Sequence, residues 1–410
     1  MRAAGVCIRR VLRTGGNGVL ARVPARTGLN LEANLVLAAE SGDLEYATRF
    51  CSRQWSHAAG EESAGSWSNK LAVGSAVAAI TALTSSESRC EVLEKDGGES
   101  RDDESLVRRG SCNFCEDDGD SMSSYFDTEY EPKKLLGCGT FGVVMLCVHK
   151  QTGRVAAVKM VQEIAGNTEE VEREKMALER LERAGGHETI VSYEGSYYHN
   201  DFHYIVVEYV PGTSLHSFVE KHHTLNATWS LQLVSQLASA LQFMHQQDIV
   251  HRDLKPENIM ALVNDNNKSH GNDDTEDVTL KIIDFGCAGR ASQPESPRTS
   301  TLSGTRCYWP PEALECQDMT SAMDMWALGC ILYILISGRH PFDLTGCSTE
   351  DEVMRRIKAE PVSFLLPVWH DVPAETKELI RGLLEKDPRH RLSADQVLEH
   401  PAIIAATKEL

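Results

Sequence analysis

The stretch His251-Arg252-Asp253-Leu254-Lys255-Pro256-Glu257-Asn258 is the most informative part of this 410-residue chain. A short β-prone run precedes it, and a second such run precedes the tripeptide Asp284-Phe285-Gly286. Because polar residues at strand ends lie on loops, we expect the two motifs to face one cleft. There, Asp253 can accept the proton of an attacking hydroxyl group, and Lys255 can neutralise charge on a transferring phosphate. Asn258 and Asp284 carry oxygen ligands of the kind that Mg²⁺ prefers.

The order of these residues resembles the H-R-D-L-x-x-x-N and D-F-G signatures of eukaryotic-type protein kinases. Lys255, two residues after Asp253, resembles the serine/threonine branch of that family rather than the tyrosine branch. The resemblance implies an α+β, bilobal protein-kinase-like fold. The smaller N-lobe would be β-rich with one αC helix, and the larger C-lobe would be α-helical. It also implies ATP and Mg²⁺ as cofactors and protein substrates with Ser or Thr acceptors.

A glycine-rich segment lies upstream of these motifs. Gly137, Gly139, Gly142 and Val144 fit the pattern G-x-G-x-x-G-x-V between two β-prone runs. Glycine has no Cβ, so a hairpin of this composition can approach phosphate groups closely. The next β-prone run ends in Val-Ala-Ala-Val-Lys159, which resembles the V-A-I-K motif. By this resemblance Lys159 would hold the α- and β-phosphates of ATP, and Val144 and Ala157 would cover the adenine.

The helical pattern at 168–184 resembles the αC helix of the family. Its register with Leu178 and Leu181 favours Glu174 as the partner of Lys159. Three other acidic residues on the same pattern are the alternatives: Glu170, Glu172 and Glu179.

A β-prone run at 204–210 resembles the strand that leads into the hinge between the lobes. The resemblance implies that Val207 is the small residue at the back of the nucleotide site. It further implies that Glu208 and Val210 contact the adenine through the hinge and that Met260 is another nucleotide contact.

Residues 287–305 are dense in Ser and Thr and resemble a kinase activation segment. Thr301 and Ser303 are the candidate regulatory sites, and a phosphate on Thr301 would meet Arg252. Further family matches imply that Glu312 of Pro310-Pro311-Glu312 pairs with Arg391, and that Asp324 braces the catalytic loop.

The 25 residues between Asn258 and Asp284 are about twice what the family resemblance implies. The extra piece, residues 264–277, is polar and acidic. We interpret it as a solvated hairpin insertion. The alternative is a calcium loop, but His270 stands where such a loop needs glycine.

Composition excludes some classes of protein. The formal charge of −19 argues against a nucleic-acid binder, because phosphate backbones require basic surface. The twelve cysteines in a chain of this length do not form a disulfide scaffold and fit a reducing compartment.

Residues 1–128 are expected to be largely disordered, with isolated helices at 31–50 and 71–83 and an acidic linker at 85–127. The segment 31–50 also resembles one unit of an ankyrin repeat, but no second copy follows. The segment 71–83 is too short for a membrane span, so we expect none; a membrane anchor is the alternative. Cys112 and Cys115 are interpreted as incidental cysteines rather than half of a zinc site.

The first 31 residues contain six arginines and no Lys, Asp or Glu, which is typical either of an organelle presequence or of a disordered basic leader. We expect a cytoplasmic or nuclear protein, with an organelle as the alternative. The kinase domain is expected at 129–402, followed by a short tail at 403–410.

The catalytic domain most resembles the calcium/calmodulin-dependent group. No basic inhibitory helix follows it in the sequence, so we do not expect control by calmodulin. The predicted function is a serine/threonine protein kinase switched by activation-loop phosphorylation. The alternative is a pseudokinase scaffold that keeps the fold without turnover, although Lys159, Asp253, Asn258 and Asp284 are all present.

Overall fold

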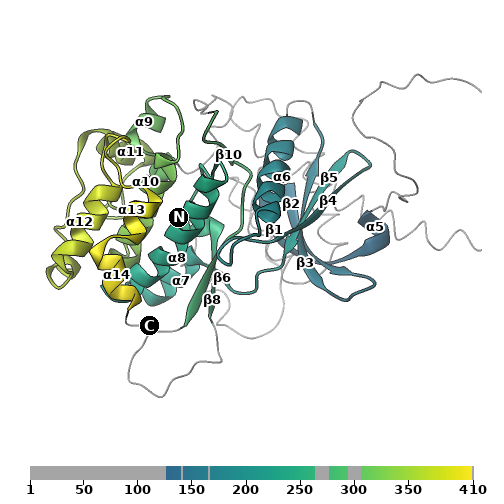
Figure 1. The fold of residues 1–410 in the computed structure, drawn as a ribbon, viewed down its shortest axis with the longest axis horizontal. Coiled ribbons are helices and arrows are strands. Elements are labelled where there is room, and N and C mark those ends of the chain that lie inside the picture. Colours follow the sequence, from purple (N-terminus) through teal and green to yellow (C-terminus); the bar gives the residue numbers. More distant parts are fainter. Residues whose placement is uncertain (1–125, 140–141, 165–166, 264–276, 294–305, 409–410) are drawn as a thin grey trace, which may run out of the picture. The chain divides into compact units, whose positions relative to one another are not determined.

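The computed structural model describes residues 126–139, 142–164, 167–263, 277–293 and 306–408 (Figure 1). Several expectations therefore lie outside the described residues. They are those for the N-terminal leader, the helices at 31–50 and 71–83, the acidic linker, Cys112 and Cys115, nearly all of the insertion, Thr301 and Ser303.

The N-terminal part of the fold, here called the N-lobe (residues 126–208), is built on a five-stranded antiparallel sheet of order β1-β2-β3-β5-β4 (Figure 1). The strands are β1 Tyr130–Gly139, β2 Gly142–His149, β3 Val155–Gln162, β4 Tyr193–His199 and β5 Phe202–Glu208. Alternate residues of β2, β3 and β5 form an apolar cluster on one face, as the two-residue period of a strand requires. The short helix α5 (Phe126–Glu129) completes this cluster, because Phe126 is fully buried and stacks on Tyr204 with ring centroids 4.3 Å apart.

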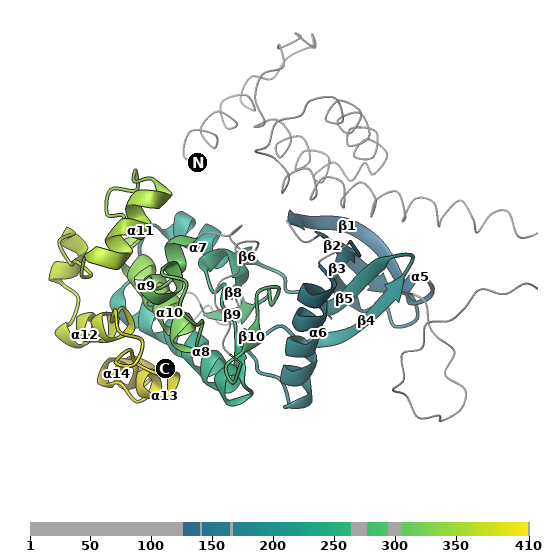
Figure 2. The same ribbon diagram turned by 90° about the horizontal axis from the view of Figure 1, so that it is seen from above.

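The other face of the sheet is covered by α6 (Thr168–Arg183), which lies beside the sheet on the side away from α5 in both views (Figures 1 and 2). Its buried residues are spaced three and four apart, which is the spacing of one helix face. They are Val171, Glu174, Ala177, Leu178 and Leu181. A carboxylate on a buried face needs a partner, and α6 thus brings Glu174 toward the sheet.

The C-terminal part, here called the C-lobe (residues 213–408), is mainly helical. At its centre lies α10 (Ala322–Ser337), which is buried on nearly all sides, as its continuous apolar sequence predicts. The long helix α8 (Ala227–Gln246) packs on it and on the last two helices. The remaining helices are α7 Leu215–His222, α9 Pro311–Leu314, α11 Glu350–Ala359, α12 Ala374–Leu383, α13 Ala394–Leu398 and α14 Pro401–Thr407.

Short strands in the C-lobe flank the two motif loops: residues 251–258 follow β7, and residues 284–286 follow β9. β6 (Thr213–Ser214), β8 (Ile259–Val263) and β9 (Val278–Ile282) form one small sheet, and β7 (Ile249–Val250) pairs with β10 (Gly289–Arg290). The described residues of the C-lobe also contain short 3₁₀ turns: η1 Pro256–Asn258, η3 Arg306–Tyr308 and η4 Pro367–His370. The two lobes meet at β9, because Ile282 donates its N–H to Thr189 O at 2.9 Å and Val191 donates to Ile282 O at 3.0 Å.

The expected bilobal α+β fold is confirmed, with small differences in element ends. The strand expected at 204–210 spans Phe202–Glu208, because its partner β3 begins at Val155 and the ladder between the two strands ends at the pair of Ala156 and Glu208. Residues 403–407, expected as part of a tail, belong to α14, where Ile403 and Ala406 are buried. Among the described residues, no helix is both long and apolar enough to cross a membrane.

Candidate active site

The catalytic loop holds three of the expected residues together. Lys255 Nζ lies 2.7 Å from Asp253 Oδ2, and Asn258 Nδ2 donates to the same oxygen at 3.0 Å and to Asp253 O at 2.9 Å. Two donors thus fix one carboxylate oxygen of Asp253 and leave Oδ1 as the atom that can take up a proton. Burial lowers the pKa of Lys255, but the Asp253 carboxylate outweighs it and the net pKa is raised. Lys255 therefore stays a cation beside Asp253.

The buried carboxylate of Asp324 on α10 binds the start of the catalytic loop. Asp324 accepts the N–H of His251 on Oδ2 and the N–H of Arg252 on Oδ1, both at 2.9 Å. These bonds support Arg252 in a left-handed backbone conformation (φ 68°), which is costly for a residue with a Cβ. Burial would raise the pKa of Asp324, but the hydrogen bond with His245 and the other donors lower it below its ordinary value. Asp324 is thus an ionised anchor for the catalytic loop.

His245, at the end of α8, was missed by the sequence analysis. Its Nε2 lies 3.0 Å from Asp324 Oδ2, so it completes the set of groups around this carboxylate. A single histidine on an amphipathic helix carries no local signal, because its partner lies 79 residues away.

A second cluster joins the two lobes. Lys159 Nζ on β3 lies 2.7 Å from Glu174 Oε2 on α6 and 3.4 Å from Asp284 Oδ1. Two of the alternatives to Glu174 are paired elsewhere, Glu172 with Lys175 and Glu179 with Arg183, and Glu170 is half-buried near the start of α6. The structure therefore places Glu174, among these four acids, against Lys159.

The electrostatics of this cluster follow from its charges. Lys159, together with the Gly286 N–H that donates to Oδ1 at 3.1 Å, holds the pKa of Asp284 at about 2. Burial opposes the charge on Lys159, but Glu174 and Asp284 raise its pKa above the ordinary value. The cluster thus presents an ionised carboxylate and a cation side by side.

The glycine-rich hairpin joins β1 to β2, and β2 pairs with β3, the strand that carries Lys159. Cys138 pairs with Val143 and Gly139 with Gly142 across the β1–β2 hairpin; residues 140–141 lie outside the description. Gly142 has φ 146°, and a Cβ built there would lie 2.1 Å from Met160 O. This position therefore requires glycine. At Gly137, by contrast, a Cβ would meet nothing within 4 Å.

Of the expected adenine contacts, Val144 and Ala157 lie on the neighbouring strands β2 and β3, and Met260 lies on β8 in the C-lobe. Val144 pairs with Lys159, Ala157 pairs with Val207, and Met260 pairs with Lys281. Val210 is buried just beyond the end of β5.

The side chain of Glu208 is engaged by other residues, and the hinge contact expected of Glu208 is a backbone contact, which stays a prediction. Glu208 Oε1 accepts the Ser192 N–H at 3.0 Å and forms an ion pair with Lys281 Nζ, which also donates to Ile190 O at 3.3 Å. The backbone N–H of Glu208 donates to Ser192 O at 3.0 Å, so a hinge contact to a nucleotide would use the backbone carbonyl oxygen of Glu208. The Lys281–Glu208 pair, across 73 residues, was another contact without a local sequence signal.

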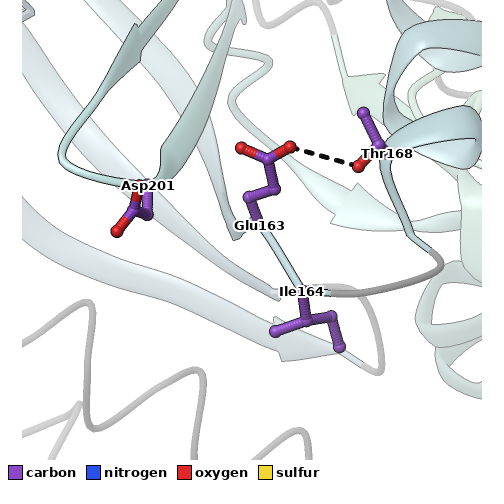
Figure 3. Close-up of a pocket in the computed structure, with 4 residues that line it drawn as sticks. All are labelled: Glu163, Ile164, Thr168 and Asp201. Atoms are coloured by element: carbon purple, nitrogen blue, oxygen red, sulfur yellow. Dashed lines mark hydrogen bonds between the residues drawn. The ribbon is translucent and has the colours of Figure 1, made fainter. Parts of the chain in front are cut away.

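A surface hollow at the start of α6 is separate from these clusters (Figure 3). It is lined by Glu163, Ile164, Thr168 and Asp201, and the Thr168 hydroxyl donates to Glu163 at 3.2 Å. None of the expected site residues lines it, so it is not part of the active site.

Comparison with known proteins identifies the class. The family model described as "Protein kinase domain" matches residues 130–403, and this chain belongs to that family. It is 41% identical over 283 residues to serine/threonine-protein kinase PKZ1 of Phytophthora infestans, covering 67% of this chain and 70% of that protein.

More distant relatives agree on the reaction. Serine/threonine-protein kinase DCLK3 of Homo sapiens is 33% identical, covering 70% of this chain and 42% of that protein. Calcium/calmodulin-dependent protein kinase type II of Caenorhabditis elegans is 32% identical, covering 69% and 37%. The chain is a serine/threonine protein kinase, an ATP-dependent phosphotransferase, with similarity to the calmodulin-dependent group. Within the described residues, nothing favours the pseudokinase alternative.

Proposed function

We propose that the two clusters divide the work of phosphoryl transfer between them. Lys159 would hold the α- and β-phosphates of ATP while Glu174 fixes its position, and the hairpin of Gly137, Gly139 and Gly142 would cover the phosphates. Asp253 would orient the acceptor hydroxyl. The observation that carries this proposal is the Lys159–Glu174–Asp284 contact, which brings one group from each of three distant segments together.

The donor set fits Mg²⁺. Asn258 uses its amide nitrogen on Asp253, so its carbonyl oxygen is the atom left for a cation. Asp284 uses Oδ1 on Lys159 and Gly286, and Oδ2 remains. Mg²⁺ prefers such hard oxygen ligands and needs only one or two of them from the protein, because phosphate oxygens and water complete its shell. When bound, the ion would neutralise charge on the phosphates.

The phosphoryl transfer needs an acceptor for the hydroxyl proton, and Asp253 would be that acceptor. The acceptor oxygen of a Ser or Thr side chain bonds to the γ-phosphorus as the bond from that phosphorus to the β–γ bridging oxygen breaks, and ADP leaves. The hydroxyl proton passes to Asp253. Lys255, held beside Asp253, would neutralise charge on the transferring group. Val144, Ala157 and Met260 would contact the adenine, with the backbone of Glu208 and Val210 as its polar partners.

Regulation by phosphate on Thr301, with Ser303 as the second candidate, is part of the proposal. The guanidinium of Arg252 lies directly over Gly289, where a Cβ would be 2.1 Å from Arg252 Cζ. Arg252 is thus in contact with the start of the activation segment, where it could form a charge-assisted pair with a phosphate. We also propose that the kinase is active without calmodulin.

A cytoplasmic or nuclear location is also proposed, with an organelle as the alternative. The seven cysteines of the described residues are free thiols, which suits a reducing compartment. A fluorescent fusion with and without residues 1–31 would decide, because only an organelle protein loses its location when a presequence is removed.

The test of the enzyme uses the full-length chain, magnesium, γ-labelled ATP and a library of Ser- and Thr-containing peptides. We expect label on seryl or threonyl oxygen, lower transfer by Thr301→Ala, a smaller loss with Ser303→Ala, and no response to Ca²⁺–calmodulin. Transfer to tyrosine alone, or no transfer by a chain that binds ATP, would contradict the proposal. Full activity of Thr301→Ala would contradict only its regulatory part.

A further inference from the structure

The end of β10 is fastened to the turn before β7 by one carboxylate. The Ser292 N–H donates to Asp248 Oδ1 at 2.6 Å, and the Ser292 hydroxyl donates to Asp248 Oδ2 at 2.7 Å. The preceding residue adds a backbone bond, because the Ala291 N–H donates to Asp248 O at 3.3 Å. We call these three bonds the Asp248–Ser292 clamp. Both oxygens of the carboxylate are used, so the clamp fixes Ser292 in position and orientation.

Asp248 makes this contact from a strained backbone conformation. Asp248 has φ 60°, a left-handed conformation in which Gly and Asn are also tolerated. An aspartate is the one of these three whose side chain accepts two charge-assisted hydrogen bonds. The pKa of Asp248 is lowered, chiefly because the Ser292 hydroxyl donates to it, so the carboxylate stays ionised near neutral pH.

The clamp lies next to the catalytic loop. Gly289 pairs with Val250 and Arg290 with Ile249, and Val250 directly precedes His251. Gly289 also contacts the Arg252 guanidinium. The β7–β10 ladder has only two residue pairs, so its position depends on what holds its ends. Ser292 is exposed, and it holds the end from which the activation segment continues.

We propose that Ser292 is a phosphate-acceptor site and that a phosphoryl group on Ser292 opens the Asp248–Ser292 clamp and lowers activity. This effect is opposite in sign to the one proposed for Thr301, and it rests on different residues.

Phosphorylation of Ser292 can only weaken the Asp248–Ser292 clamp, because it removes a hydrogen-bond donor and adds negative charge. As the Ser292 oxygen bonds to the γ-phosphorus of ATP, the bond from that phosphorus to the β–γ bridging oxygen breaks and ADP leaves. The hydroxyl proton passes to the catalytic aspartate of the kinase that acts on Ser292, so the donor of the 2.7 Å bond is lost. The new group carries close to two negative charges and would face the Asp248 carboxylate, which repels it. Because the hydroxyl is engaged in the clamp, phosphorylation captures molecules in which the segment has already lifted. Modification therefore keeps the open form open.

A nearby cation does not reverse this result. Arg290 Nε lies 3.8 Å from Asp248 Oδ2, and about half of its side chain is exposed. Such a pair is weak because water screens it. A phosphoserine that turned toward Arg290 would have to leave Asp248, so attraction to Arg290 would open the clamp just as repulsion by Asp248 does.

The test places phosphoserine at position 292 of the full-length chain during translation. We expect kcat/KM for a peptide substrate to fall about tenfold, the scale of a lost hydrogen bond to a charged group. Amide hydrogen exchange in the peptide covering 286–293 should rise. The matched control is Gln293→phosphoserine. Gln293 is an exposed neighbour without a bond to Asp248, and this variant should keep its activity within about twofold.

A second background isolates the repulsion. Asp248→Asn keeps the turn, since asparagine tolerates a positive φ, and its amide can donate to a phosphate. In this background, phosphoserine at 292 should lower kcat/KM by less than about threefold, because the repelling charge is gone. An equal loss in both backgrounds, or no loss in the native one, would overturn the proposed mechanism.

The acceptor role is checked in the protein isolated from the cells that make it. Peptides covering residue 292 should include a phosphorylated fraction by mass spectrometry. A Ser292 that remains unmodified, while phosphate on other residues of the same preparation is detected, would overturn its assignment as an acceptor.

Discussion

Lys159 and Glu174 form a two-point ion pair, with Nζ 2.8 Å from Oε1 and 2.7 Å from Oε2. The pair joins β3 to α6, and the same ammonium group reaches Asp284 in the other lobe at 3.4 Å. Any movement of α6 therefore changes the charge environment of Asp284. The position of one helix thus controls both the phosphate contact and a proposed magnesium ligand.

This arrangement predicts a pKa change at Asp284. The Lys159 ammonium holds the pKa of Asp284 at about 2, below its ordinary 3.8. The ionised carboxylate therefore stabilises the fold fully above its unfolded pKa of 3.8, and that contribution is lost progressively as the pH falls from 3.8 through the folded pKa of about 2. Lys159→Met should raise this pKa. Carboxyl carbon NMR should then show Asp284 beginning to titrate as the pH is lowered from 7 to 4, where the native chain shows no change.

The control for that experiment is Lys358→Met, which removes an exposed lysine on α11. It should leave the Asp284 resonance as in the native chain. An Asp284 that titrates identically in all three proteins would show that Lys159 does not set its pKa.

Asp253 is expected to act in the chemical step and not in nucleotide binding. Asp253→Ala should lower kcat by about 10²–10⁴, the range for removal of a positioned proton acceptor. The dissociation constant for Mg·ATP should stay within about twofold, because Lys159 and Asp284 remain. Rapid-quench kinetics and a fluorescent ATP analogue measure the two quantities. Asp371→Ala, an exposed aspartate, is the control, and a native kcat in Asp253→Ala would contradict the assigned role.

Local patterns predicted much of this molecule from its sequence. The β-prone runs predicted the positions of β1, β2, β3 and β5 but did not locate β4, and the register with Leu178 and Leu181 indicated the inward face of α6. Motif order predicted that Asp253, Lys255 and Asn258 would gather, and they do.

The contacts that escaped prediction are all long-range. Asp248 meets Ser292 across 44 residues, and Glu208 meets Lys281 across 73. Each contact depends on how two segments that are distant in the sequence are placed in the fold. A short sequence window does not contain that information. The side chain of Glu208 shows the consequence: family order placed the residue at the hinge, but only the fold shows that its carboxylate is occupied by Lys281.

The two ends of the glycine-rich hairpin should respond differently to the same substitution. Gly142→Ala would place a Cβ 2.1 Å from Met160 O in a backbone conformation that L-residues rarely adopt. Gly137→Ala meets nothing within 4 Å. We expect Gly142→Ala to lower the melting temperature clearly and Gly137→Ala to leave it nearly unchanged.

Calorimetry of both variants without nucleotide measures this difference, and the KM for ATP can be determined on the same preparations. Gly137→Ala should affect KM alone, through the approach of the backbone to the phosphates. Equal melting temperatures for the two variants would mean that the β2–β3 contact at Met160 adjusts without cost.

The buried pair of Glu312 and Arg391 should be the most sensitive ionic contact in the C-lobe. Arg391 Nη1 and Nη2 lie 2.6 and 2.9 Å from the two carboxylate oxygens, and both side chains are almost fully buried. Arg391 also donates to Glu385 O at 2.9 Å and to Ala322 O at 2.8 Å. Glu312→Gln leaves a buried cation without its counter-charge, so the free energy of unfolding should fall by about 3–5 kcal/mol.

Comparison of single and double variants separates the charge from the packing. Arg391→Met should cost more than Glu312→Gln, because it also strands the carbonyl groups of Glu385 and Ala322. The double variant should cost less than the sum of the two, since the second change removes a charge that the first left unpaired. Arg389→Ala, which removes a fully exposed partner of Asp387, is the control and should leave urea unfolding unchanged. Additive losses in the double variant would mean that each side chain stabilises the C-lobe independently, through its own packing and backbone contacts rather than through the pair.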